Sequence, residues 1–192
     1  MTIAIIGPEK FAFQDLVCVD LALTALADGP VALVPEQAGH EDATLSWPTE
    51  EGVPTATLEV QIKGAAGTFD VAMLAEHLLH YPERAGKGSL LERLMDGKGR
   101  AVLFVISARC ADMLTPLLLD RAPRALVEGR AVNTELAEAL RTAVTAVGQK
   151  SLSKKQSKLK EARRLDAQAL AARPFDDYAR ALRHLAVMER QT

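Results

Sequence analysis

The chain has 192 residues, of which 48% are hydrophobic and 25% charged, and its formal net charge is −2. This is ordinary globular composition, sufficient for one domain, or for one domain and an extension, with a proper hydrophobic core. The near-neutral charge favours no class of partner, and the few aromatic residues argue against a stacking platform for single-stranded nucleic acid.

The cysteines, and the lack of a signal peptide or a transmembrane run, indicate the cellular compartment. Cys18 and Cys110 both lie in apolar stretches, which is typical of buried free thiols. No Cys-x-x-Cys pair or Cys/His cluster is present, which argues against structural zinc. The N-terminal apolar run is too short for a signal peptide, and no run reaches transmembrane length. We therefore expect a cytoplasmic protein without a membrane partner.

The first part of the chain predicts a helix followed by a three-stranded meander. The helix covers residues 11 to about 27, and the strands cover residues 31–36, 41–47 and about 55–63. In the second strand Asp42 alternates with apolar positions, as Gln61 does in the third. If these two strands pair antiparallel with their apolar faces buried together, Asp42 and Gln61 lie on the same side of the sheet.

The second part predicts one further buried strand among helices. Two helical stretches follow residue 69, and residues 100–107 are almost continuously apolar, which favours a central strand covered on both faces. From residue 111 the pattern is almost wholly helical, with a last helix running nearly to Thr192. The predicted fold class is therefore α/β, a central mixed β-sheet flanked by helices. Residues 1–125 are expected to form its core, and residues 126–192 a helical extension that leads into further domains.

The polar face of the third strand gathers Glu59, Gln61 and Lys63. Magnesium prefers hard oxygen ligands and keeps several waters, so one or two carboxylates and a substrate phosphate suffice to bind it. A lysine two positions after a metal ligand points the same way and can orient the attacking water. By spacing alone, the same pattern also fits a plain solvated hairpin face.

Three motifs in order carry a family resemblance: FAFQDLV in the first helix, PEQAGHEDATLSW, and TLEVQIKG. They resemble the PD-(D/E)XK nuclease superfamily, and more narrowly the endonuclease effector domains of bacterial antiviral (CBASS-type and STAND NTPase) defence proteins. In that group an aromatic-x-Tyr/Phe-Gln helix precedes Glu…Glu-Asp and then Gln-x-Lys. The resemblance covers about residues 10 to 110 and implies a restriction-endonuclease-like fold.

The resemblance implies roles for individual residues. Asp42 matches the metal-binding aspartate, Gln61 the acid-or-glutamine position, Lys63 the lysine and Gln14 the glutamine of the first helix, while Glu36 matches an upstream acid. The expected catalytic residues are thus Asp42, Gln61, Lys63 and Gln14, with Mg²⁺ or Mn²⁺ held by Asp42, Gln61 and Glu36. Gln61 departs from the general pattern, because an amide oxygen binds a cation less strongly than a carboxylate does, although the Mrr-like branch carries Gln-x-Lys.

Lysine and arginine gather in residues 150–164 against the single acid Glu161. Clustered cations neutralise DNA phosphates, so Lys154, Lys155 and Lys158 are candidate substrate-binding residues. A solvated helix face or a linker would carry the same run.

Two functional hypotheses follow. The first is a Mg²⁺-dependent endonuclease domain cleaving double-stranded DNA. The resemblance adds that such domains are effector modules of antiphage defence proteins, fused to sensor or NTPase domains and activated by oligomerisation, so a homo-oligomer is expected. The second is a catalytically inactive α/β module that binds nucleic acid or protein, with a merely solvated Glu59/Gln61/Lys63 face. The role of Glu59 stays open between supplying charge at the site and forming a salt bridge, and Glu41 is a possible helper whose role also stays open.

Overall fold

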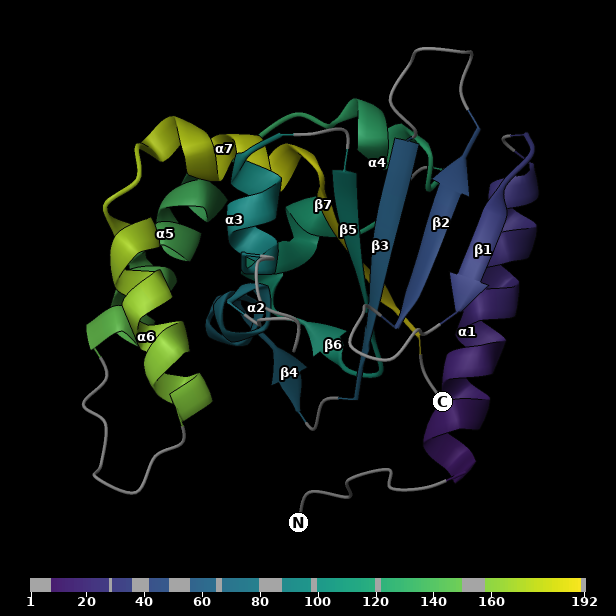
Figure 1. The fold of residues 1–192 in the computed structure, drawn as a ribbon, viewed down its shortest axis with the longest axis horizontal. Helices are drawn as coiled ribbons and strands as arrows, with labels where there is room; N and C mark the ends of the chain where they lie inside the picture. Colours follow the sequence, from purple (N-terminus) through teal and green to yellow (C-terminus); the bar gives the residue numbers. More distant parts are fainter. Residues whose placement is uncertain are drawn as a thin grey trace.

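The computed structural model describes residues 8–27, 29–35, 42–48, 56–64, 67–79, 88–97, 100–119, 122–149 and 158–190 (Figure 1). The described residues form a five-stranded mixed sheet in the order β1-β2-β3-β5-β7. Its strands are β1 (Ala32–Pro35), β2 (Ala43–Trp47), β3 (Ala56–Lys63), β5 (Arg100–Ile106) and β7 (Leu185–Glu189). A small second sheet pairs β4 (Thr68–Phe69) with β6 (Arg109–Cys110).

Strand directions divide the large sheet into two halves. β1, β2 and β3 form the predicted antiparallel meander, with Ala43 opposite Val60 and Leu45 opposite Leu58. β3, β5 and β7 run parallel, which requires crossover connections made here by helices. The predicted fold class, a central mixed sheet flanked by helices, is therefore confirmed.

Helices cover both faces of the sheet. One face packs against α1 (Pro8–Leu26) and the short α4 (Ala125–Glu128). The other packs against a larger helical layer (Figure 1), which consists of α2 (Val71–Leu78), α3 (Leu90–Met95), η1 (Asp112–Leu117), α5 (Thr134–Gln149), α6 (Lys158–Ala171) and α7 (Phe175–Arg183). None of the described helices has the length and apolar character needed to cross a bilayer.

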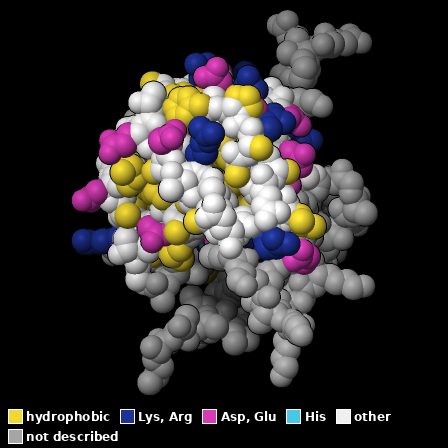
Figure 2. Space-filling model, turned by 90° about the vertical axis from the view of Figure 1, so that its left-hand side faces the viewer, with side chains coloured by type: hydrophobic (Ala, Val, Ile, Leu, Met, Phe, Trp, Pro, Cys, Tyr) yellow, Lys and Arg dark blue, Asp and Glu magenta, His cyan; other side chains and the backbone are white. Residues whose placement is uncertain are grey.

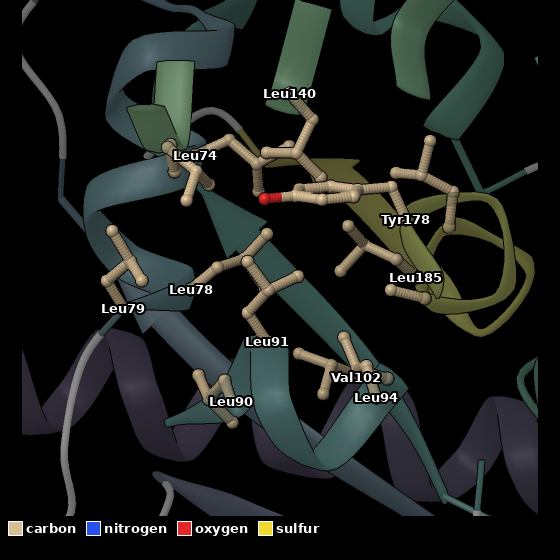
Figure 3. Packing of buried hydrophobic residues seen from close by; sticks show 14 of the residues in the cluster. Leu74, Leu78, Leu79, Leu90, Leu91, Leu94, Val102, Leu140, Tyr178 and Leu185 are labelled. Atoms are coloured by element: carbon tan, nitrogen blue, oxygen red, sulfur yellow. The ribbon is translucent and has the colours of Figure 1, made fainter. Parts of the chain in front are cut away.

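β5 contributes side chains to the hydrophobic clusters on both faces of the sheet. Its alternate residues belong to two different buried clusters, with Leu103 on the α1 side and Phe104 on the side of the helical layer. Figure 3 shows the second cluster, in which leucines of α2 and α3 surround Val102 together with Leu140, Tyr178 and Leu185. The expectation of a central strand buried on both faces is confirmed.

The C-terminal region differs from the sequence prediction. The last helix was expected to run nearly to Thr192, but α7 ends at Arg183 and Leu185–Glu189 forms β7, parallel to β5. Leu185 and Val187 face one buried cluster and Ala186 the other, which is a period of two. A short apolar run fits a strand and a helix equally well by periodicity. Residues 126–192 thus supply a strand and several helices to the common core instead of forming a helical extension beside it.

The buried Tyr178 makes the stability of the fold depend on pH. Its side chain is fully buried and its hydroxyl donates a 2.9 Å hydrogen bond to the carbonyl of Leu170. Burial raises the pKa of Tyr178 to about 12. The unfolded chain releases this proton near pH 10 while the folded chain keeps it, so stability should fall above pH 10, by at most about 1.4 kcal/mol per pH unit.

We therefore expect Tyr178→Phe to lose about 1 kcal/mol at pH 8, where only the hydrogen bond is removed. Between pH 10 and pH 11 the variant should lose less stability than the wild type, because its phenyl ring has no proton to release. Urea denaturation of both proteins at each pH measures the difference. Equal alkaline losses would show that Tyr178 does not carry this dependence.

Candidate functional site

Asp42 and Lys63 meet where β2 begins and β3 ends. Asp42 directly precedes β2 and Lys63 is the last residue of β3. Because Ala43 lies opposite Val60, the antiparallel register continues to Asp42 beside Gln61. The Nζ atom of Lys63 lies 3.2 Å from Oδ2 of Asp42. The structure thus brings these three residues to one side of one strand pair, as the strand pattern predicts.

The carboxylate of Asp42 is held by two donors. Oδ2 accepts a 2.6 Å hydrogen bond from the backbone N–H of Ile62 as well as the contact from Lys63. The side chains of Asp42 and Lys63 are 17% and 26% exposed, so the pair lies at the rim of the sheet and remains open to solvent. This arrangement keeps a carboxylate and an ammonium fixed side by side at an accessible position.

Gln14 supports this rim from α1. Its side chain is only 6% exposed, and its Nε2 donates a 3.2 Å hydrogen bond to the main-chain carbonyl of Asp42. Gln14 therefore acts on the backbone that carries the Asp42 side chain, and it comes from the face of the sheet opposite Gln61 and Lys63. The structure thus places Gln14 in contact with the main chain of Asp42.

Gln61 has the setting expected of a ligand-binding amide. It is 6% exposed and lies level with Phe104 of the neighbouring strand. Within the part of the chain that the structure describes, its carboxamide takes part in no hydrogen bond. Its amide atoms are also not among the fully buried side-chain atoms that lack a partner, so they reach solvent at the rim, where a ligand could contact them.

The hypothesis of a merely solvated polar face is wrong for β3. Glu59 is 4% exposed and Gln61 6%, because the helical layer covers this side of the sheet. Oε1 of Glu59 accepts hydrogen bonds from Nη1 of Arg93 and Nη1 of Arg100, each at 2.9 Å. Of the two roles left open for Glu59, the structure supports the salt bridge, which ties β3 to α3 and to the start of β5.

His77 is a further residue on this side of the sheet, and its sequence context alone does not place it there. Its ring stacks on Phe69 at 5.9 Å between ring centroids and lies 6.1 Å from the ring of Phe104. Since Phe104 and Gln61 share a register position, His77 lies over the same face of the sheet as the candidate site. The alternation of β5 predicts which face Phe104 occupies, but only the packing of α2 brings His77 there.

Several predicted residues lie outside the described part of the chain. These are Glu36, Glu41, Lys154 and Lys155, together with the side chain of Lys158, which opens α6. In the described part of the basic run, Nη2 of Arg164 lies 2.6 Å from Oε1 of Glu161, and this contact lowers the pKa of Glu161. Figure 2, which views the side of α5, α6 and α7, shows basic and acidic side chains interspersed with hydrophobic ones.

Among the described residues, no group of three or more His, Cys, Asp and Glu side chains is arranged to hold a metal. Magnesium can nevertheless be bound by one or two protein carboxylates when water and substrate phosphate complete its shell. Asp42 and Gln61, which are adjacent in the strand register, are the residues that could supply such oxygen ligands. No protein-family model, curated protein or solved structure matches the chain.

Proposed function

We propose that this chain is a Mg²⁺-dependent endonuclease domain that hydrolyses double-stranded DNA. The observation that carries the proposal is the Asp42–Lys63 ion pair at 3.2 Å, next to Gln61 on the same side of the strand pair. The order of these residues is also that of the nuclease superfamily that the sequence resembles. The direct test is conversion of supercoiled plasmid to nicked or linear DNA in Mg²⁺, stopped by a chelator.

Asp42 and Gln61 would hold the metal, with Glu36 as a further acidic ligand, and Mn²⁺ would replace Mg²⁺. When bound, such an ion polarises the phosphate and lowers the pKa of a coordinated water. Carboxylate and amide oxygens are hard donors, which suits Mg²⁺ and Mn²⁺ better than zinc.

In the proposed cleavage, the side chains of this protein would position the reacting groups and balance their charge. Lys63 is held by Asp42 yet is 26% exposed, so its ammonium can orient an attacking water and offset the charge that develops on the phosphate. Gln14 fixes the main chain of Asp42, and the Glu59 ion pairs anchor the strand that presents Gln61 and Lys63. Each of these groups acts without changing its covalent state.

DNA binding would depend on Lys154, Lys155 and Lys158. Neutralising phosphates releases counterions, so affinity for double-stranded DNA should fall steeply with salt, whatever the sequence of the DNA. By resemblance, the domain would be the effector module of a cytoplasmic antiphage defence protein, fused to sensor or NTPase domains and activated when copies come together.

The second candidate is a catalytically inactive module that binds nucleic acid or protein. It is favoured by one observation, that Oδ2 of Asp42 is already satisfied by the N–H of Ile62 and by Lys63. A structural aspartate makes contacts of this kind. Metal binding separates the two candidates, because only the nuclease requires it.

Mn²⁺ should raise the unfolding temperature of the wild type by a few degrees once its concentration exceeds the dissociation constant, since a ligand of the folded state stabilises it by mass action. Asp42→Asn should abolish this shift. Asp15→Asn, which changes an exposed carboxylate of α1, is the matched control and should keep it. A shift that is absent from the wild type, or unchanged in Asp42→Asn, contradicts metal binding by Asp42.

A further inference from the structure

The outward face of α1 carries an apolar stripe with coiled-coil spacing. Its members are Leu16, Val19, Leu23 and Leu26, with exposed fractions of 67%, 55%, 65% and 54%. Exposed Ala12 extends the stripe, so successive members are separated by 4, 3, 4 and 3 residues. That alternation is the a/d pattern of a helix that packs against another helix.

The stripe is additional to the face by which α1 holds the sheet. Val17, Cys18, Leu21 and Ala25 are buried against the sheet, and the stripe residues point away from it. α1 forms the outer side of the molecule next to the edge strand β1, and none of the described elements lies beyond it (Figure 1). A surface helix usually needs one apolar face, so α1 has a second one with no partner in the described chain.

We propose that this stripe is the surface through which two copies of the chain associate, α1 against α1 about a two-fold axis. An a/d seam packs its side chains into holes formed by another such seam, and a second copy supplies one of matching length and residue size. A two-fold pair uses the same patch on both partners, so one apolar stripe is sufficient for a closed dimer. The proposal stands whether or not the Asp42 site cleaves DNA.

The net charge of α1 argues against an anionic lipid surface as the occupant. Helices that lie on anionic membranes carry lysine and arginine on their polar face. α1 has Glu9, Asp15 and Asp20 but only one basic residue, Lys10, so it carries net negative charge. An anionic membrane surface would repel it.

The negative charge of Asp20, at one side of the stripe, is neutralised within the same chain. It lies four residues after Leu16 and three before Leu23, which places it along one side of the stripe. The guanidinium of Arg190, which follows β7, forms an ion pair with its carboxylate. Each copy therefore presents a neutral pair on this flank, so two copies approach there with little repulsion between like charges.

The size of the stripe fits the centre of a small dimer interface. Four side chains that are each more than half exposed provide on the order of 200–300 Å² of apolar surface on each copy. A stable interface buries about 800 Å² per partner, with an apolar centre inside a polar rim. The stripe therefore supplies the apolar centre, and neighbouring polar residues would supply the rim.

Sedimentation velocity of the 192-residue chain at about 1–200 µM tests the proposal. We expect the wild type to dimerise with rising concentration, and Leu16→Glu/Leu23→Glu to weaken dimerisation at least tenfold. The matched control is Leu165→Glu, which places the same charge at a 52% exposed leucine of α6 and should dimerise as the wild type does. If Leu16→Glu/Leu23→Glu impairs folding, the milder variant Leu16→Ser/Leu23→Ser takes its place, and it should also weaken dimerisation.

Two results would overturn the proposal. One is a wild type that stays monomeric at about 200 µM. The other is equal weakening by Leu165→Glu and by the α1 variants. Flotation with vesicles containing phosphatidylserine addresses the lipid alternative, and a monomeric chain that floats through its α1 stripe would assign that face to a membrane. Sedimentation measures only association, and plasmid cleavage measures only nuclease activity. Either proposal can therefore fail while the other holds.

Discussion

Lys63→Ala is expected to lower Mg²⁺-dependent cleavage of double-stranded DNA by at least about 100-fold, the usual loss when one stabilising group is removed from the reacting centre. The fold should be retained, since Asp42 keeps the N–H of Ile62 as a donor and its side chain reaches solvent at the rim. Gel analysis of supercoiled plasmid gives the rate, and thermal unfolding verifies the fold.

Arg183→Ala is the matched control for this experiment. It removes an exposed cation from the end of α7, on an element that does not contribute to the site, and should cleave at the wild-type rate. The nuclease assignment of Lys63 is wrong if folded Lys63→Ala cleaves plasmid as fast as the wild type. It is also wrong if both variants lose cleavage equally, because the effect would then be one of overall charge.

Glu59→Gln should be the most destabilising conservative substitution in β3, with a loss of about 3 kcal/mol in the free energy of unfolding. Removing one partner of a buried ion pair leaves the other charge uncompensated, which typically costs about 3–5 kcal/mol. Arg93 is the partner most affected, since its side chain is only 13% exposed, while that of Arg100 is 43% exposed and can be hydrated. The lower end of the range is therefore expected.

Urea denaturation at neutral pH measures this effect. The matched control is Glu161→Gln, which makes the same change in the exposed Arg164–Glu161 pair of α6 and should leave stability almost unchanged. Arg93→Ala should also destabilise more than Arg100→Ala. Equal stabilities of the Glu59→Gln and Glu161→Gln proteins would mean that the buried cluster does not tie β3 to α3.

The strand pairing around the site could be predicted because both strands alternate strictly. Ala43, Leu45 and Trp47 in β2 and Leu58 and Val60 in β3 must share the buried face, and a slip of one residue would turn each set outward. This constraint alone brings Asp42 to the side of Gln61. The near-continuous apolar run of β5 likewise fixed its central position.

Other features depend on contacts between distant residues and could not be predicted. Leu185 pairs with Val102 in the parallel register of β5 and β7, a separation that local periodicity cannot reveal. The burial of Glu59 depends on Arg93 from α3, which covers the face that looked solvated in isolation. The exposed stripe of α1 could not be predicted either. The sequence shows one broad apolar face but does not show which part of it packs against the sheet.

A crystal of the chain soaked in Mn²⁺ would show directly whether Asp42 and Gln61 hold a divalent cation, as we propose. We expect an anomalous peak bound by a carboxylate oxygen of Asp42 and by the amide oxygen of Gln61. The same peak should be absent from Asp42→Asn crystals treated identically. A well-ordered site without an ion at saturating Mn²⁺, in which Asp42 still accepts only from Ile62 and Lys63, would contradict it.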